Sequence, residues 1–302
     1  MNSKPILIVA GEPNSIFLEI FFKALKYKKY KTPLILIGSH KLLALQMKHL
    51  NFKKKINLID CKKIEVKKLD NKSINLINIK YNTNKPFEKI SFKSNKYIER
   101  SFIMAFNIIK AGISNKLING PISKKQFLKK KFLGITEYIA KHFSYKKNAM
   151  LIYNKKLSIC PITTHLPLKL VAKKINKFIV LEKVTLIDRF YKQYLGYKPR
   201  IALLGLNPHC ESILKYNEDD IILKPLIKRL TNLKFDISGP YSADTIFLKN
   251  NRKNYDVIVG MYHDQVLTPI KTLFEYDAIN ITLGLPFIRI SPDHGPNEKM
   301  MG

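Results

Sequence analysis

The chain has 302 residues, of which 46% are hydrophobic and 25% charged. This composition is too apolar for a disordered protein, and the length suits one large domain or two smaller ones. No segment approaches the roughly 20 uninterrupted apolar residues that cross a bilayer, so we expect no membrane partner. The apolar run at the amino terminus stops at Gly11-Glu12-Pro13 without a cleavage site, which favours a buried strand over a signal peptide. Three scattered cysteines favour a reducing cytoplasm.

The formal net charge of +32 raises the question of a nucleic-acid partner. Only six of the 54 basic residues are Arg, and the Lys residues are scattered along the chain. Nucleic-acid readers favour Arg for bidentate contacts. We therefore expect no nucleic-acid partner, while a polyanion partner stays open as the alternative. The positive field would in either case attract anionic substrates.

Short apolar runs alternate with helical patterns, which is typical of an α/β fold. Amphipathic helices are expected at Ile16–Tyr27 and Phe178–Tyr194, and irregular connections around short strands at Phe52–Ser91. The turn residues Asn119-Gly120-Pro121 indicate a transition between domains. Strands are expected at Ile6–Ala10, Leu34–Ile37, Ala149–Tyr153, Leu157–Ile162, Arg200–Gly205 and Val257–Met261.

Three of the seven histidines follow predicted strands. His165 comes after Leu157–Ile162, His209 after Arg200–Gly205, and His263 after Val257–Met261. The carboxyl ends of strands form the ligand-binding edge of open α/β sheets. Three imidazoles meeting there would hold one divalent ion and leave a coordination position open, as in catalytic sites. Such an ion polarises a substrate oxygen. The alternative is three separate loop histidines, each with a local hydrogen bond.

Several polar residues accompany these histidines. Lys271, Asn280 and Arg289 follow at nine-residue intervals, and Arg289 lies in an apolar stretch. A buried guanidinium needs an anionic or polar partner, so Arg289 forms either an internal ion pair or a clamp on phosphate or carboxylate. Asp264 and Asp244 are candidate acid/base groups or supports for the metal ligands. Asp244 is equally well placed to cap a helix.

Two common nucleotide-binding motifs are missing. No G-x-G-x-x-G follows a strand, and there is no G-x-x-x-x-G-K-[ST]. The sequence therefore supports neither a classical Rossmann dinucleotide site nor a P-loop.

Motifs along nearly the whole chain resemble the 4-hydroxythreonine-4-phosphate dehydrogenase (PdxA) family of pyridoxal phosphate biosynthesis. The matching segments are GEP at Gly11–Pro13, NGPISKKQF at Asn119–Phe127, GITEYIA at Gly134–Ala140, TTHLPLK at Thr163–Lys169, LNPH at Leu206–His209, GPYSADTIF at Gly239–Phe247, YDVIVGMYHDQVLTPIK at Tyr255–Lys271 and NITLGLPFIRISPDHG at Asn280–Gly295.

The resemblance implies two α/β/α domains with a cleft between them, similar to isocitrate and isopropylmalate dehydrogenases. We expect a first domain of residues 1–120 with roughly 285–302, and a second of residues 121–284 that carries the histidines. It further implies a homodimer whose active site the partner subunit completes.

The implied reaction is the oxidation of a small phosphorylated substrate by NAD or NADP, with one divalent metal ion per site. The family's metal ligands fall on His165, His209 and His263. Three histidines suit Zn, Co or Mn, and Mg less naturally.

The family's substrate contacts fall on Thr136, Lys271, Asn280 and Arg289. Ile135 occupies a position where the family usually has His, so one substrate hydrogen bond is expected to be lost or replaced. This difference keeps open a related dehydrogenase for another phosphorylated four-carbon hydroxy acid. The charge keeps open a non-catalytic, basic binding protein.

Two further departures concern the chain's ends. Asn14-Ser15-Ile16-Phe17 follows GEP in place of the family's Gly-rich turn, and Pro296–Gly302 follows Gly295 where the family continues into a final helix.

Overall fold

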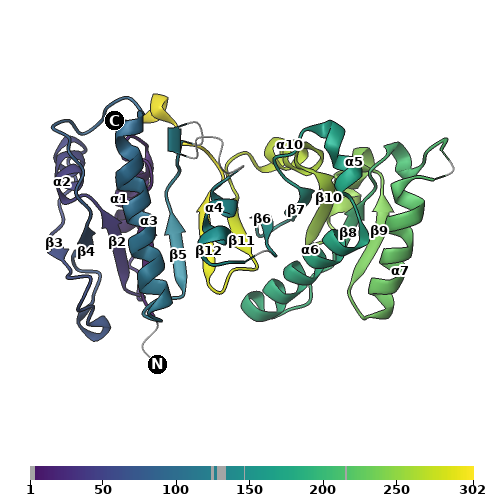
Figure 1. Ribbon diagram of the computed structural model, residues 1–302, viewed down its shortest axis with the longest axis horizontal. Coiled ribbons are helices and arrows are strands. Elements are labelled where there is room, and N and C mark those ends of the chain that lie inside the picture. Colours follow the sequence, from purple (N-terminus) through teal and green to yellow (C-terminus); the bar gives the residue numbers. More distant parts are fainter. Residues whose placement is uncertain (1–3, 124–125, 128–133, 146, 215) are drawn as a thin grey trace. The chain divides into compact units, whose positions relative to one another are not determined.

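A computed structural model describes residues 4–123, 126–127, 134–145, 147–214 and 216–302. Lys124 and Lys125, which belong to the NGPISKKQF motif, lie outside the described residues. The chain divides into two compact units, Met1–Tyr138 with Pro286–Gly302 and Ile139–Leu285 (Figure 1). The domain boundaries implied by the resemblance stay a prediction.

The first unit contains a parallel sheet with strand order β3-β4-β2-β1-β5-β12 (Figure 1). Its central strands are buried on both faces, as continuous apolar runs such as LILIG in β2 predict. The strands are β1 (Ile6–Val9), β2 (Leu34–Gly38), β3 (Ile56–Leu58), β4 (Ile74–Asn78), β5 (Lys116–Asn119) and β12 (Ile288–Pro292).

Amphipathic helices accompany this sheet. In α1 the buried residues Phe17, Leu18, Phe21 and Phe22 recur at helical spacing, and α3 packs on β1 and β2. Ser39 caps α2 because its hydroxyl accepts a hydrogen bond from the Leu42 N–H. The helices are α1 (Phe17–Tyr27), α2 (His40–His49), α3 (Asn95–Lys110) and α4 (Ile135–His142), which crosses the division between the units.

The second unit contains a mixed sheet with strand order β11-β6-β7-β10-β8-β9. β7, β10, β8 and β9 are parallel, while β6 pairs antiparallel with both β11 and β7. The strands are β6 (Ala149–Tyr153), β7 (Ser158–Thr163), β8 (Ile201–Leu204), β9 (Ile237–Tyr241), β10 (Val257–Tyr262) and β11 (Ile279–Leu283).

Helices of the second unit pack on this sheet, α6 against β6 and β7, and α10 against β7 and β10. α6 continues into a π-helical turn, η5 (Tyr191–Leu195), and a second π-helix, η7 (Asp219–Leu223), leads into α7. The helices are α5 (Val171–Lys174), α6 (Lys177–Phe190), α7 (Lys224–Asn232), α8 (Ala243–Ile246), α9 (Lys249–Arg252) and α10 (His263–Phe274).

The predicted α/β class is confirmed, and each of the six predicted strands is present within two residues of its expected ends. Four strands were not predicted: β5, β9, β11 and β12. Their sequences mix polar and apolar residues, as in IRISP of β12, where Arg289 and Ser291 are the buried residues. In the part of the chain that the structure describes, no helix is both long and apolar enough to cross a membrane.

Candidate active site

The three predicted histidines follow adjacent parallel strands. β10 lies between β7 and β8 and is parallel to both, so the three carboxyl ends share one edge of the second unit's sheet. His165 lies two residues beyond β7, His263 begins α10 directly after β10, and His209 lies in the short turn after β8. We call His165, His209 and His263 the histidine edge. The sequence pattern placed all three at this edge.

Two of these imidazoles are neighbours. The ring centroids of His165 and His263 are 6.0 Å apart, with 37° between the ring planes. The Nδ1 atom of His263 lies 2.6 Å from Oδ1 of Asp264. A carboxylate only accepts hydrogen bonds, so this contact places the proton on Nδ1 and leaves the lone pair of Nε2 available to a ligand. This contact fits a supporting role of Asp264 for the ring of His263; that role and the acid/base role stay predictions.

His209 has an unusual backbone. Its φ of 55° and ψ of 15° lie in the left-handed region, and Cys210 follows with φ 59°. Non-glycine residues in that region store strain that surrounding contacts must hold. The His209 side chain is exposed, so it can rotate without disturbing a packed neighbour.

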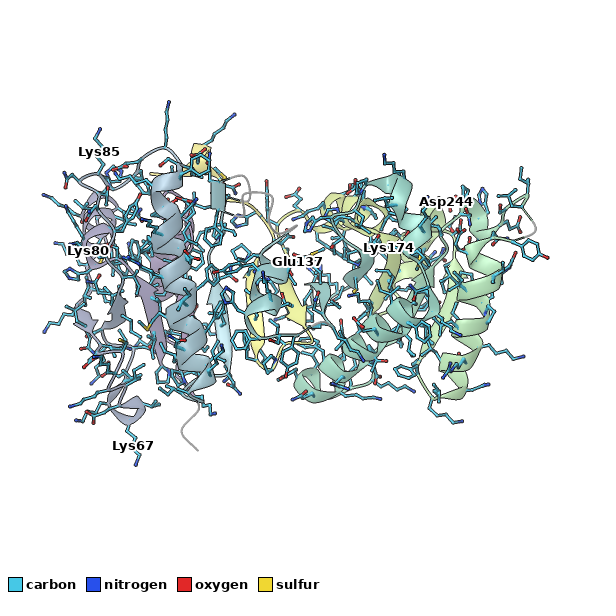
Figure 2. All side chains as sticks on the ribbon, in the orientation of Figure 1. Lys67, Lys80, Lys85, Glu137, Lys174 and Asp244 are labelled. Carbon is cyan, nitrogen blue, oxygen red and sulfur yellow. The ribbon has the colours of Figure 1, made fainter. Side chains whose placement is uncertain are left out.

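Asp244 interacts electrostatically with His209. Hydrogen bonding from Ser242 lowers the pKa of Asp244, and the charge of His209 lowers it further. The alternative that Asp244 caps a helix was wrong, because Ser242 occupies the N-cap position of α8, which begins at Ala243. The exposed Asp244 lies within the first turn of that helix (Figure 2).

The histidine edge fits a divalent ion in part. Imidazole nitrogens suit Zn²⁺ or Co²⁺, and two rings that share one ion stand roughly 5–6 Å apart at nitrogen–metal distances of about 2 Å. The pair His165 and His263 meets this spacing. Among the residues that the structure describes, however, no group of three His, Cys, Asp or Glu side chains lies within reach of one ion. A three-histidine set stays a prediction.

Arg289 forms a second polar centre, in the first unit. Its side chain is fully buried on β12. Nε donates to Oδ1 of Asn119, at the end of the neighbouring strand β5, at 2.7 Å, and Nη1 donates to Oγ1 of Thr136 at 3.4 Å. Burial lowers the pKa of Arg289 to about 10, opposed by the charge of Glu137 (labelled in Figure 2), so the guanidinium stays charged at pH 7. We call Arg289, Asn119 and Thr136 the arginine centre.

The other predicted substrate contacts lie on α10, β11 and α4. Lys271 lies at the far end of α10 from His263, about 12 Å along the axis, with its Nζ 5.6 Å from the ring centre of Tyr276. Asn280 lies on β11 with its Oδ1 buried and no described hydrogen-bond donor on it. Ile135 is half-buried at the start of α4, beside Thr136.

Glu12 is a buried carboxyl group that the sequence reasoning missed. Only 1% of it is exposed, beyond the carboxyl end of β1. Oε2 accepts from the Ser94 hydroxyl at 3.0 Å, and Oε1 from the Asn14 N–H at 3.3 Å. Burial raises the pKa of Glu12 to about 7, while these two hydrogen bonds lower it. Asn119 was likewise noted only as a turn residue. For Glu12 the available signal was a polar residue shortly after the apolar strand β1, and for Asn119 a polar residue at the end of the short strand β5.

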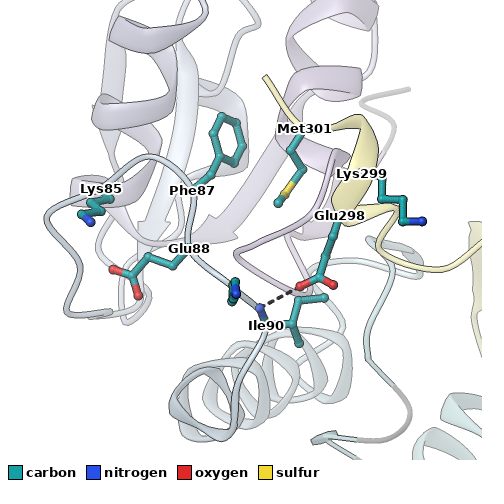
Figure 3. A pocket seen from close by; sticks show the side chains of 8 residues that line it. Lys85, Phe87, Glu88, Ile90, Glu298, Lys299 and Met301 are labelled. Atoms are coloured by element: carbon teal, nitrogen blue, oxygen red, sulfur yellow. Dashed lines mark hydrogen bonds between the residues drawn. The ribbon is translucent and has the colours of Figure 1, made fainter.

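A cavity of about 890 Å³ lies elsewhere in the first unit. Figure 3 shows Phe87 and Met301 on its walls, and Oε1 of Glu298 accepting a hydrogen bond from the Ile90 N–H at 2.8 Å. The lining mixes both charges, and no described residue of the predicted site is part of it: Lys85, Phe87, Glu88, Lys89, Ile90, Glu298, Lys299 and Met301. This cavity therefore does not coincide with the described residues of the predicted site.

Several of the described lysines face solvent. Lys67, Lys80 and Lys85 are exposed and extend outward from the first unit (Figure 2). A wide distribution of this kind gives a general positive field rather than a binding patch of defined shape.

Comparison with known proteins settles the family. The family described as "Pyridoxal phosphate biosynthetic protein PdxA" matches residues 29–300. The chain belongs to the PdxA family. It is 38% identical to a 4-hydroxythreonine-4-phosphate dehydrogenase of Sulfurihydrogenibium sp., over 98% of this chain and 92% of that protein. It is 31% identical to a D-threonate 4-phosphate dehydrogenase of Salmonella typhimurium, over 98% of this chain and 92% of that protein.

Solved structures agree with this membership. The crystal structure of a 4-hydroxythreonine-4-phosphate dehydrogenase from Klebsiella pneumoniae has a TM-score of 0.80 at 28% identity, over 99% of this chain and 93% of that one. This PdxA-family chain is therefore an enzyme of the oxidoreductase class.

Proposed function

We propose that this enzyme oxidises the 3-hydroxyl of 4-phosphooxy-L-threonine with NAD, in pyridoxal phosphate biosynthesis. The product, 2-amino-3-oxo-4-phosphooxybutanoate, is a β-keto acid and loses carbon dioxide to give 3-amino-2-oxopropyl phosphate. The proposal rests on relatives named 4-hydroxythreonine-4-phosphate dehydrogenase that match nearly the whole chain. NADP is the alternative cofactor, and the proposed setting is a cytoplasmic homodimer without nucleic-acid or membrane partners.

The pairing of His165 and His263 at the carboxyl edge of adjacent strands is the observation that carries the metal dependence. We assign His165, His209 and His263 as ligands, with the exposed His209 side chain rotating to complete the set. A divalent ion in that position supplies Lewis-acid polarisation of the substrate oxygen. Asp264 holds His263 in one tautomer and orientation.

We assign substrate anchoring to the arginine centre. Arg289 offers a charged fork that is already oriented by Asn119 and Thr136, and a preoriented fork loses little freedom when it binds a phosphate or carboxylate. Lys271 and Asn280 are proposed as further substrate contacts. Asp244 interacts electrostatically with His209, and its negative charge favours a cation there.

The test is NADH appearance with 4-phosphooxy-L-threonine, before and after treatment with a chelator and after adding back Zn²⁺, Co²⁺, Mn²⁺ or Mg²⁺ separately. We expect turnover that the chelator stops and one or more of these ions restores. Turnover that is indifferent to the chelator would remove the metal from the proposal. If folded protein produces no NADH under any of these conditions, 4-phosphooxy-L-threonine is not its substrate.

A second candidate substrate is D-threonate 4-phosphate. The relative from Salmonella typhimurium named for that activity matches the chain over the same length as the first relative, at lower identity. Ile135, where the family usually has His, lies next to Thr136 of the arginine centre. Measuring kcat/KM for both substrates on one preparation decides between them: a preference for D-threonate 4-phosphate would replace the first proposal.

A further inference from the structure

Asp219 is a buried carboxylate that neither the motifs nor the proposed reaction uses. It is fully buried at the start of the π-helix η7. Its Oδ1 accepts from the Leu206 N–H at 2.7 Å, and its Oδ2 accepts from the Asn207 N–H at 3.0 Å and from Asn207 Nδ2 at 2.7 Å. Three donors of the segment before His209 therefore converge on one carboxylate.

Gln265 ties the same segment to the helix that carries His263. Oε1 of Gln265 accepts from the Met261 N–H at 2.7 Å, and Nε2 donates to the Gly205 carbonyl at 2.8 Å. Gln265 lies two residues after His263, and Gly205 directly follows β8. A single side chain thus links the carboxyl end of β10 to the carboxyl end of β8.

These contacts join into one path from His263 to His209. The path runs through Gln265, Gly205 and Asp219, and we call Asp219 and Gln265 the strand-end brace. Gly205 sits tightly within it, because a Cβ there would lie 2.7 Å from Sγ of Cys210 and 2.9 Å from Oδ1 of Asp219. The left-handed backbone of His209 and Cys210 begins just beyond these contacts, and such conformations persist only where the surroundings hold them.

We propose that Asp219 and Gln265 are positioning residues that fix the backbone of residues 205–210, so that His209 is presented at a constant place relative to His263. The proposal rests on the proposed function of the histidine edge. The exposed His209 side chain rotates to meet the ion, while the strand-end brace keeps the backbone of residues 205–210 in place. π-Helical turns are frequent at functional sites, and here the turn aims Asp219 at the loop.

The experiment measures Co²⁺ and Zn²⁺ affinity by titration calorimetry, without substrate or nicotinamide cofactor. Asp219→Asn keeps the size of the side chain but places an NH₂ group against N–H donors. We expect metal affinity to fall about 10- to 100-fold, which is typical when a group that orients a ligand is lost. Asp220→Asn is the matched control, because the neighbouring Asp220 is exposed and pairs with Lys224 instead. Its affinity should stay within about threefold of the wild type.

Two further readouts separate positioning from general stability. Hydrogen exchange at the amides of Leu206 and Asn207 should accelerate in Asp219→Asn, while the strand amides of β8 keep their protection. Turnover of that variant should need more metal for half-maximal rate yet approach the wild-type rate at saturating metal. Gln265→Glu keeps the acceptor for the Met261 N–H and loses the donor to the Gly205 carbonyl, so it should also weaken metal binding. This variant replaces Asp219→Asn if the latter does not fold.

Each outcome decides the proposal. Wild-type metal affinity in folded Asp219→Asn and Gln265→Glu, or an equal loss in Asp220→Asn, overturns the brace and leaves the proposed function standing. Failure of the wild-type protein to bind Co²⁺, Zn²⁺, Mn²⁺ or Mg²⁺ overturns the brace together with the metal dependence of the proposed function.

Discussion

The histidine edge and the arginine centre are built in opposite ways. At the histidine edge the three imidazoles lie just beyond the ends of three strands, with His209 exposed on a left-handed backbone. In the arginine centre a single guanidinium is fully buried on a strand and held by two hydrogen bonds. The first region has an exposed imidazole at the same sheet edge as two others, whereas the second has a buried, charged donor held by Asn119 and Thr136.

Because of this difference, we expect the two regions to bind their ligands in different ways. A metal supplies strong, short bonds, so its ligands tolerate exposure as long as the backbone presents them correctly. An anion is bound by hydrogen bonds that water weakens, so a buried and preoriented Arg gains more from each bond. We expect substitutions at the histidine edge to act through metal affinity, and those in the arginine centre through substrate affinity.

The largest expected effect is from His209→Asn, which removes the imidazole while Asn tolerates the left-handed backbone. Turnover and metal affinity should fall by more than roughly 100-fold, beyond the loss expected for a supporting residue, with the melting temperature unchanged. His40→Asn is the control, since His40 also follows a strand but lies exposed in the first unit. His209→Ala should give the same loss of activity. Full activity in either variant would refute the ligand assignment.

Arg289→Lys tests the other region. Lysine keeps the charge but loses the fork that reaches both Asn119 and Thr136, so kcat/KM for the phosphorylated substrate should fall about 10- to 100-fold, mainly through KM. Metal affinity should not change. Arg200→Lys, at an exposed pair with Asp256, should have little effect. A lower melting temperature with unchanged KM would instead make Arg289 a purely structural group.

Glu12→Gln tests the protonation of the buried Glu12 carboxyl group through the pH dependence of the free energy of unfolding. Folding raises the pKa of Glu12 from 4.5 to about 7, so the folded protein holds a proton that the unfolded chain releases. Stability is therefore lost as the pH rises between about 4.5 and 7. Gln cannot ionise, so its gain in the free energy of unfolding over wild type should be roughly 2 kcal/mol larger at pH 8 than at pH 5.

Urea unfolding at the two pH values measures this gain. Glu19→Gln, which removes a carboxylate paired with Lys23 on the surface of α1, controls for the general loss of a negative charge. An equal effect of Glu12→Gln at both pH values would show that Glu12 is ionised throughout this range in the folded protein.

The histidine edge was predictable because its signal is local. Each histidine follows an uninterrupted apolar run such as VIVGM before His263, and parallel strands bring such ends to one edge. The order of β7, β10 and β8 was needed only to show that they are neighbours. The left-handed backbone of His209 had no signal in the sequence, because only a small minority of residues other than Gly adopt it.

The arginine centre and the brace were less predictable because their partners are distant or ordinary in sequence. Arg289 and Asn119 are 170 residues apart, and β12, which carries Arg289, does not show the apolar run of a buried strand. Asp219 lies in the run Glu218-Asp219-Asp220, which is typical of a solvated helix start. Only the fold shows that the middle carboxylate points inward to the loop after β8.

The smallest effect is expected from Ile135→His, which restores the residue that the family usually has beside Thr136. One added hydrogen bond contributes about 0.5–1.5 kcal/mol, so kcat/KM for 4-phosphooxy-L-threonine should rise roughly three- to tenfold. Ile135→Leu, which adds no donor, should leave it unchanged. Because the substitution changes none of the three histidines, metal affinity should stay constant. A gain for D-threonate 4-phosphate alone would mean that the pocket beside Ile135 already selects the second candidate substrate.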